Sequence, residues 1–344
     1  MKYASLGATG IHVSRICMGT MTFGSPLTQS DCDRLVSAAL DQGINFFDTS
    51  DVYEGYTRTW GSGGGVSETI LGKALAGQRH RAVICTKFGN PAGAGPLDAG
   101  LSSHHLERQM EASLRRLQTD HVDVFLAHRW DGAIAMDELL RTFDRWIQSG
   151  KVRCVGSSNF PVWRIAQACE MSVASGRPKL QVLSPKYNLM RRGVELEQAA
   201  CARHYGASLV SYQPLEAGVL SGKYRRDEPA PAGSRGSDMP GWIPKLDEAT
   251  HDRLDGLRVL AAECGASPAE YAMAWVLSRS QVAATILGWR SEEQMNSAVR
   301  AVDLQIPAGH LPRIDALFPP PAPLGDERIL QWRESGWKLE NNEP

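Results

Sequence analysis

The sequence lacks a hydrophobic run long enough to cross a bilayer, an excess of either charge and closely paired cysteines. A membrane-spanning helix needs roughly 18 consecutive apolar residues, and no run approaches that length. The formal net charge of −1 provides no basic field for nucleic acid or an anionic membrane surface. Residues 1–10 also lack the apolar core of a signal peptide. We therefore expect a cytoplasmic protein that binds neither nucleic acid nor a membrane.

The cysteines are few and scattered, and they exclude two small-domain architectures. Their number is odd and no Cys-x-x-Cys occurs, which argues against both a disulfide framework and a zinc knuckle. Adjacent His104 and His105 have no acidic or thiol partner at ligand spacing, so we expect no metal site and expect both, with His121, at the surface. The cysteines are Cys17, Cys32, Cys85, Cys154, Cys169, Cys201 and Cys264.

Short apolar runs alternate with helical patterns along the 344 residues. The apolar runs predict parallel strands buried on both faces, because such strands are apolar almost throughout. The predicted strands are Ile16–Met18, Asn45–Asp48, Ala82–Lys87, Val122–His128, Val152–Ser157, Gln181–Ser184, Ser208–Tyr212 and Ala283–Leu287.

The segments between these strands carry the apolar spacing and the end signals of helices. Several begin after a serine that can cap the first turn. The predicted helices are Ser30–Leu40, Glu68–Ala76 capped by Ser67, a helix capped by Ser102 or Ser103 that extends through Leu117, Met136–Gln148, Pro161–Ala174, Val194–Tyr205, Asp252–Cys264, Pro268–Ser278 and Glu292–Val299.

Eight strand-then-helix units favour a closed barrel or an open doubly wound sheet. Lys2–Leu6 and Val13 flank Gly7–Gly10 like the arms of a hairpin, which we expect to plug the bottom of a barrel. No Gly-x-Gly-x-x-Gly follows the first strand, although an open dinucleotide-binding sheet would require it. The sequence therefore predicts an α/β fold, a (β/α)8 TIM barrel with an N-terminal β-hairpin and a C-terminal extension.

Three glycine-rich or proline-rich segments are too irregular for helices or strands: Tyr53–Val66, Gly89–Gly100 and Lys223–Leu246. We expect the last to be a mobile surface loop. We expect residues 1–318 to form a single barrel domain and residues 319–344 to form a tail. Trp332 and Trp337 should dock that tail on or near the barrel.

Ionisable residues stand at the ends of three predicted strands. Asp48, Lys87 and His128 each end an apolar run, and Tyr53 lies in the loop after Asp48. Taken singly, a strand-end Asp often caps a turn, a Lys is often a solvated charge and a His is often a satisfied polar group. In a barrel, however, the C-terminal strand ends meet on one face, where active sites are built. The coincidence of these residue types there favours catalysis.

These four side chains suit carbonyl reduction. A tyrosine pKa of about 10 is too high for ready proton delivery near neutral pH. We expect the neighbouring ammonium of Lys87 to lower the pKa of Tyr53 and Asp48 to fix Lys87 in place. His128 can donate a hydrogen bond to a substrate oxygen. No nucleophile is needed, and hydride would have to come from a cofactor.

The chain resembles the aldo-keto reductases from Lys2 to about Leu304. The resemblance implies an NAD(P)H-dependent alcohol:NADP⁺ oxidoreductase whose catalytic tetrad matches Asp48, Tyr53, Lys87 and His128, with Tyr53 as general acid and base. The longer chain is similar to the potassium-channel β-subunit-like members. The segments that carry the resemblance are Gly43–Tyr53, Ser67–Gly72, Thr86–Phe88, Gly150–Arg153 and Gly156–Phe160.

The resemblance also implies a cofactor site. Ser158 and Asn159 match the pair that binds the nicotinamide carboxamide, and Tyr212 matches the aromatic that stacks on its ring. Arg290 opens the last helix and can pair with a 2′-phosphate, so we expect NADPH as cofactor, with NADH possible. The implied cofactor-binding residues are Ser158, Asn159, Ser184, Tyr212, Gln213, Pro214, Leu215, Gly218, Leu220, Gly222, Lys223, Gly288, Arg290 and Gln294.

Two departures from the family pattern put cofactor affinity in question. Ser184 stands where the family usually has Gln, and its hydroxyl can bond the carboxamide only over a shorter reach. Ala298 stands where an Asn usually contacts adenine.

The substrate stays open at this point. Trp60, Arg129, Trp130 and Trp242 could line a wide mouth that suits a sugar or nucleotide sugar, although loop tryptophans often only pin loops. We expect a small-molecule carbonyl substrate and either a monomer or a homo-oligomer. The alternative is a cofactor-binding accessory subunit resembling potassium-channel β subunits, which we favour less because nothing precedes the hairpin in the sequence.

Overall fold

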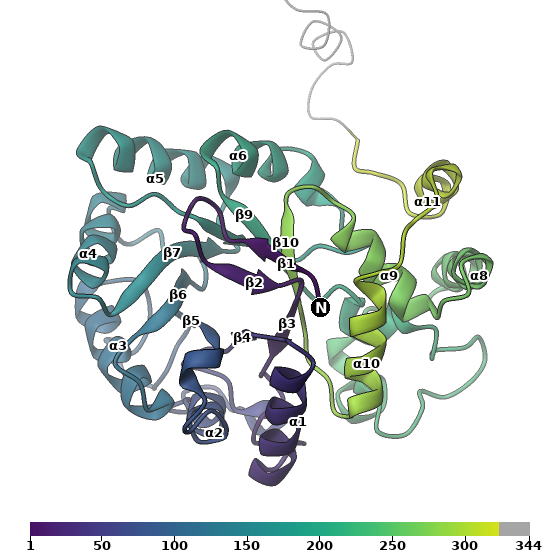
Figure 1. Cartoon of the computed structure of the whole chain (residues 1–344), viewed down its shortest axis with the longest axis horizontal. Coiled ribbons are helices and arrows are strands. Elements are labelled where there is room, and N and C mark those ends of the chain that lie inside the picture. The colour runs from purple at the N-terminus through teal and green to yellow at the C-terminus, as the bar shows by residue number, and fades with distance from the viewer. Residues whose placement is uncertain (323–344) are drawn as a thin grey trace, which may run out of the picture.

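A computed structural model describes residues 1–322 of the chain. It forms a closed barrel of parallel strands in the order β10-β3-β4-β5-β6-β7-β8-β9, with helices around it (Figure 1). This confirms the predicted (β/α)8 barrel. The barrel strands are β3 (Ile16–Gly19), β4 (Phe46–Asp48), β5 (Val83–Phe88), β6 (Val122–Ala127), β7 (Val152–Ser158), β8 (Val182–Ser184), β9 (Ser208–Tyr212) and β10 (Val282–Leu287).

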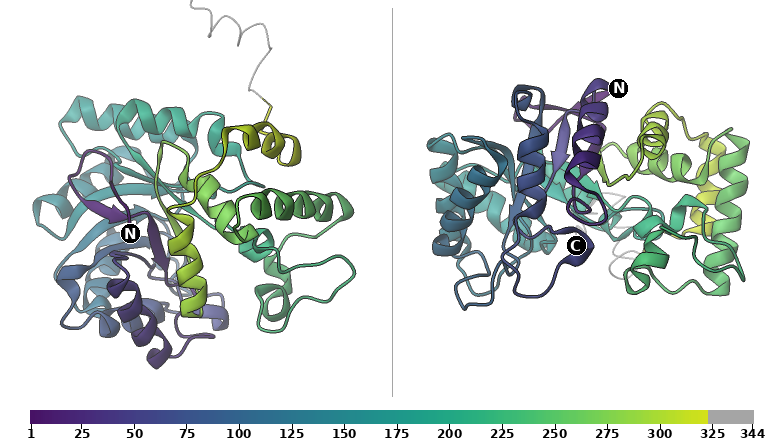
Figure 2. Two further views of the ribbon diagram at one scale, coloured as in Figure 1. Left: turned by 45° about the vertical axis from the view of Figure 1, so that its right-hand side comes forward. Right: turned by 90° about the horizontal axis from the view of Figure 1, so that it is seen from below.

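Most barrel strands are followed by a helix that packs on the outside of the barrel. α7 and α8 lie in the long connection between β9 and β10, and α8 packs against both α9 and α11 on one side of the barrel (Figure 2). The helices are α1 (Gln29–Asp41), α2 (Val66–Ala74), α3 (Ser103–Leu117), α4 (Met136–Gln148), α5 (Val162–Ser175), α6 (Gln198–Tyr205), α7 (Arg235–Asp238), α8 (Glu248–Glu263), α9 (Pro268–Leu277), α10 (Glu292–Ala301) and α11 (Leu311–Leu317).

The N-terminal hairpin plugs one end of the barrel, as predicted. β1 (Tyr3–Ser5) pairs antiparallel with β2 (His12–Ser14), and the hairpin lies across the barrel end (Figure 1). Leu6 and Val13 are buried in the same apolar cluster as the inward-facing Val124 and Leu126 of β6. Phe125 between them belongs to the second cluster, between the barrel and the helices. This alternation is the period-2 pattern of a strand buried on both faces.

The cysteines behave as small core residues. All seven are free, and Cys17, Cys32, Cys85, Cys154 and Cys169 are buried. Free cysteine is commonly buried as a small hydrophobe. Among the helices of residues 1–322, none combines the length and the hydrophobicity that crossing a bilayer demands.

Several predicted element ends are wrong for identifiable reasons. The cap of α1 is Thr28, which forms a capping box with Asp31, rather than Ser30. Ser67 lies inside α2, where its buried hydroxyl bonds Thr20 instead of capping the helix. The helix predicted from Val194 starts only at Gln198, after a separate 3-10 turn.

The Lys223–Leu246 segment is more regular than predicted. It contains α7 and a 3-10 turn at Pro240–Trp242. The buried hydroxyl of Tyr224 accepts a hydrogen bond of 2.9 Å from the Gly236 backbone, which ties the two arms of the segment together. Trp332 and Trp337 lie outside the described residues, and the domain division after residue 318 stays a prediction.

Candidate active site

The barrel brings Asp48, Lys87 and His128 to one rim. Asp48 ends β4, and Lys87 lies one residue before the end of β5, the next strand. His128 directly follows β6 and donates its backbone N–H to the Phe88 carbonyl at 2.8 Å. Because β4, β5 and β6 are parallel neighbours, their last residues meet on the same face of the barrel.

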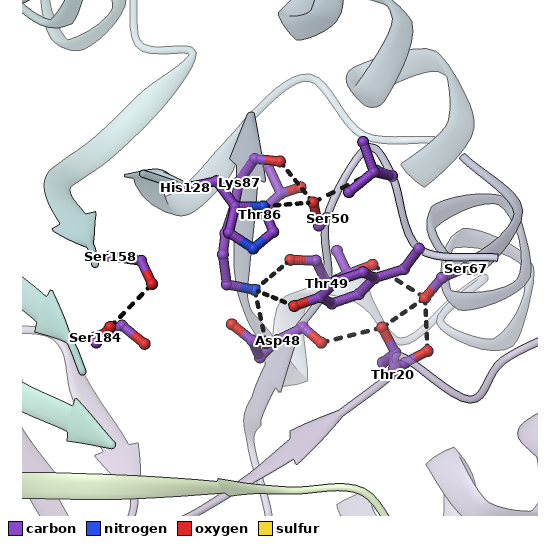
Figure 3. A network of polar contacts seen from close by, with 12 residues as sticks. Thr20, Asp48, Thr49, Ser50, Ser67, Thr86, Lys87, His128, Ser158 and Ser184 are labelled. Atoms are coloured by element: carbon purple, nitrogen blue, oxygen red, sulfur yellow. Dashed lines mark hydrogen bonds and ion pairs between the residues drawn. The ribbon is translucent and has the colours of Figure 1, made fainter. Parts of the chain in front are cut away.

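The ammonium of Lys87 has a partner for each of its three protons. Its Nζ lies 2.8 Å from Asp48 Oδ2, 2.7 Å from the Thr49 carbonyl and 3.4 Å from the Tyr53 hydroxyl (Figure 3). An ammonium can only donate, so the Tyr53 oxygen must accept this bond. The hydroxyl proton of Tyr53 has no acceptor among residues 1–322, and it is therefore available to a substrate.

The loop after β4 holds Tyr53 firmly at this rim. The Tyr53 backbone N–H bonds the Ser50 carbonyl at 3.2 Å, and its carbonyl accepts from the Ser67 N–H at 2.9 Å. The Ser67 hydroxyl is in turn 2.6 Å from that of Thr20 (Figure 3). The rings of Tyr53 and His128 meet edge to face, 5.9 Å between centroids. Tyr53 and His128 therefore border the same space.

Burial and the charge of Asp48 together set the pKa values of Lys87 and Tyr53. Asp48 and Lys87 are each only 3% exposed. Burial by itself lowers the pKa of Lys87, but the Asp48 carboxylate outweighs it and the pKa of Lys87 lies above its ordinary value. Burial raises the pKa of Tyr53, and Lys87 opposes this only in part. Lys87 acts on the pKa of Tyr53 in the expected direction, but burial outweighs it and the pKa of Tyr53 lies above its ordinary value.

His128 is neutral and oriented by a residue that the sequence did not reveal. Burial first, and then the charges of Lys87 and Arg129, lower the pKa of His128 well below its ordinary value. Its Nδ1 lies 3.2 Å from the Ser50 hydroxyl, which also contacts the Lys87 carbonyl at 2.9 Å and Asp51 at 3.1 Å (Figure 3). With Nδ1 against Ser50, Nε2 is the ring nitrogen left for a substrate.

The residues predicted to bind a nicotinamide carboxamide lie beside His128. Asn159 Nδ2 donates to the His128 carbonyl at 3.1 Å, and the Tyr212 hydroxyl donates to Asn159 Oδ1 at 2.7 Å. Ser158 donates to the Ser184 carbonyl at 2.9 Å (Figure 3). The Ser184 hydroxyl is buried without a hydrogen-bond partner among the described residues. Buried polar groups rarely stay unpaired, so this hydroxyl fits a ligand donor or acceptor.

A strained turn follows Tyr212. Positive φ angles occur at Gln213 (54°), Glu216 (45°), Ala217 (56°) and Gly218 (98°). Strain of this kind persists only where surrounding contacts enforce it, and it is common at ligand clamps. Here the buried Glu216 carboxylate accepts from Lys186 at 2.8 Å and from Asn188 at 2.7 Å. The turn contains the predicted cofactor residues Gln213, Pro214, Leu215, Gly218 and Leu220, and Gly222 and Lys223 follow it.

Arg290 is already engaged by side chains and backbone of distant segments. It donates to the Gly233 carbonyl at 2.8 Å and to Asp238 at 2.9 Å, and it also contacts the Tyr56 hydroxyl. The predicted Gln294 accepts a bond of 2.8 Å from the Arg290 backbone N–H, which orders the start of α10. Gly288 directly follows β10 at the same rim, and its role in cofactor binding stays a prediction.

The four residues predicted to contact substrate do not lie together in the structure. Arg129 is exposed and follows His128 directly. Trp130 packs edge to face on Phe160, 5.4 Å between centroids, at the same rim. Trp60 is 85% exposed. Trp242 instead packs on Tyr56, 5.6 Å between centroids, at the Arg290 end.

Sequence reasoning also misjudged or missed several residues. His105 was expected at the surface, but it is buried on the inner face of α3, and burial lowers its pKa. Ser50, Tyr56, Arg235 and Asp238 were not predicted as site residues. Ser50 lies in a loop, Tyr56 in a 3-10 turn and Arg235 and Asp238 in the four-residue α7, and such short segments carry no periodic pattern that fixes which way a side chain points.

The fold and the rim define a barrel enzyme with acid–base groups at the C-terminal ends of its strands. Comparison with known proteins agrees with this class. Residues 15–318 match the model of the Aldo/keto reductase family. The chain therefore belongs to the aldo/keto reductase family and is an NAD(P)H-dependent oxidoreductase that acts on carbonyl groups.

Relatives with very different names cover nearly the whole chain. The chain is 36% identical to "Uncharacterized oxidoreductase YrpG" of Bacillus subtilis, over 93% of this chain and 97% of that protein. It is 33% identical to "Probable voltage-gated potassium channel subunit beta" of Oryza sativa, over 88% and 92%. It is 28% identical to "Versiconal hemiacetal acetate reductase" of Aspergillus parasiticus, over 94% and 98%.

Proposed function

We propose that this chain reduces an aldehyde or ketone, with NADPH as cofactor and Tyr53 as the general acid. One observation carries the proposal. Lys87 donates to the Tyr53 oxygen at 3.4 Å, which leaves the Tyr53 proton free for a carbonyl oxygen. A sugar or nucleotide-sugar carbonyl is within this class, and Arg129 and Trp130 beside His128 are the side chains that would meet its polar ring.

In the proposed reduction, each residue of the rim has a separate role. Tyr53 donates its proton to the carbonyl oxygen as negative charge develops there. Lys87 stabilises the tyrosinate that remains, and Asp48 at 2.8 Å holds Lys87 in position. Neutral His128 would donate a hydrogen bond from Nε2 to the same oxygen in the tautomer whose Nδ1 accepts the Ser50 O–H, and this bond would fix the carbonyl in place. The bound nicotinamide supplies the hydride.

The cofactor proposal is supported by two features of the described residues. The unpaired, buried Ser184 hydroxyl and the strained turn after Tyr212 fit a bound dinucleotide. Ser158, Asn159 and Ser184 would hold the carboxamide, and Tyr212 would stack on the nicotinamide ring. The turn would cover the pyrophosphate, and Arg290 would meet a 2′-phosphate at the start of α10.

A screen of carbonyl compounds tests this function. The purified protein is mixed with NADPH and, separately, with aldehydes, ketones and sugars, and the loss of nicotinamide absorbance is followed. We expect turnover with at least one class of carbonyl and none without it. If NADPH binds tightly but no compound across a broad panel is reduced, the reductase proposal fails.

The second candidate is a regulatory or accessory role. It is favoured by the relatives named as potassium channel β subunits, which align over most of this chain. Tight cofactor binding without turnover, together with recovery of a defined membrane protein complex, would support it over the reductase.

A further inference from the structure

The Arg290 end of the candidate cofactor site holds three cations, Lys223, Arg235 and Arg290, of which Arg290 pairs with the Asp238 carboxylate. The guanidinium groups of Arg235 and Arg290 lie 6.0 and 5.1 Å from the centre of the Tyr56 ring. Lys223 Nζ lies 5.8 Å from the centre of the Tyr224 ring, whose hydroxyl accepts from the Gly236 N–H beside Arg235. Burial and the two guanidinium groups lower the pKa of Lys223. Within residues 1–322, Asp238 is the only acid paired with any of the three. The cluster therefore keeps an excess of positive charge, which suits an anionic ligand.

The hydrogen bonds of Arg290 show where that ligand and Asp238 would meet. One terminal nitrogen of Arg290 donates both to Asp238 at 2.9 Å and to the Gly233 carbonyl at 2.8 Å. The other contacts the Tyr56 hydroxyl. A guanidinium has five N–H groups, so two remain for a phosphate. A phosphate bound there would share the same guanidinium with the Asp238 carboxylate.

We propose that Asp238 sets the cofactor preference of this chain, because its carboxylate occupies Arg290 and thereby weakens NADPH binding relative to NADH. This rests on the proposed function, in which Arg290 meets the 2′-phosphate of NADPH. The 2′-phosphate is an anion, and a second anion on the same guanidinium repels it. The corresponding group of NADH is a neutral hydroxyl, which a nearby carboxylate does not repel.

The predicted effect is moderate because both side chains remain partly solvated. The side chains of Arg290 and Asp238 are 25% and 28% exposed. Repulsion between partly solvated like charges is modest, and we expect an effect of about fivefold in affinity, which corresponds to about 1 kcal/mol. Asp238→Asn keeps a hydrogen-bond acceptor for Arg290 and removes only the charge.

Direct binding measurements on the whole chain test the proposal. Dissociation constants for NADPH, NADH and 2′,5′-ADP are measured by titration calorimetry for the parent protein and for Asp238→Asn. We expect NADPH and 2′,5′-ADP to bind about fivefold more tightly to the variant, with NADH unchanged. The gain should shrink as salt is added, because screening weakens the repulsion.

A matched control separates a local effect from a general change of charge. Glu292 lies two residues beyond Arg290 but pairs with Arg34 at 2.7 Å, so Glu292→Gln removes the same charge without touching Arg290. An equal gain in NADPH affinity in Glu292→Gln would overturn the proposal, and so would unchanged or weaker NADPH binding in Asp238→Asn. If the parent protein binds neither dinucleotide, the proposed function itself fails.

Discussion

At the scale of single residues, the chemistry of the candidate site depends on which side chain holds each proton. Lys87 has three N–H groups and three acceptors, of which the Tyr53 hydroxyl is one. Tyr53 therefore keeps its own proton for the substrate. Neutral His128 has one ring proton, so its Nε2 can donate to the same oxygen only when Nδ1 accepts from the Ser50 hydroxyl. Acid–base chemistry at this rim depends on Tyr53 being protonated and His128 being neutral.

The pH dependence of reduction follows from the two pKa shifts. Burial raises the pKa of Tyr53 above 10.0, so the acid form persists through neutral pH and is lost only as pH rises beyond that value. The pKa of His128 lies well below 6.5, so the ring is neutral above that pH. We expect kcat for reduction to stay level from about pH 7 to about pH 9 and to fall at higher pH. An inflection near neutral pH in a kcat profile would contradict these assignments.

At the scale of secondary structure, the position of Tyr53 depends on how closely α2 packs on α3. The loop that carries Tyr53 leads directly into α2, and the Ser67 N–H in its first turn bonds the Tyr53 carbonyl. Gly72, in the next turn, faces the end of α3 so closely that a Cβ there would lie 2.5 Å from the Arg116 carbonyl oxygen. The glycine permits this approach. A side chain at Gly72 would push the two helices apart.

Gly72→Ala tests this packing, because two effects oppose each other. Alanine favours a helix by about 1 kcal/mol over glycine, whereas overpacking costs about 1–3 kcal/mol. Because the clash is with backbone, which cannot rotate away, we expect the cost to lie in the upper part of that range and the free energy of unfolding in urea to fall by about 1–2 kcal/mol. The control is Gly309→Ala, where a Cβ meets nothing within 4 Å. Equal stability of the two variants would show that the helices are not in tight contact.

At the scale of the whole molecule, most of the fold was predictable because the barrel strands are apolar runs that follow one another in chain order. Continuous apolar runs identified the barrel strands, and Ser208–Tyr212 was predicted to the residue. Strand order then follows from chain order, because parallel units wind in one direction. That reasoning places Asp48, Lys87 and His128 on one face without any knowledge of contacts.

What could not be predicted depends on loops and on burial. Ser50 and Asp238 make contacts between segments far apart in the sequence, and no local pattern encodes these contacts. The pKa of Tyr53 was misjudged because the charge of Lys87 is visible in the sequence while the depth of burial is not. His105 was misplaced for the same reason, since a polar residue on a helix gives no sign of the face it occupies.

We propose that the barrel gathers a proton donor and its supporting charges from separate strands around one carbonyl site. Tyr53→Phe removes only the hydroxyl, so the measurement is a single turnover of a carbonyl substrate by protein with NADPH already bound, together with the Kd for NADPH. We predict that the rate falls by about 100-fold to 10,000-fold while the Kd is unchanged. Reduction by the variant at the rate of the parent protein would contradict the account.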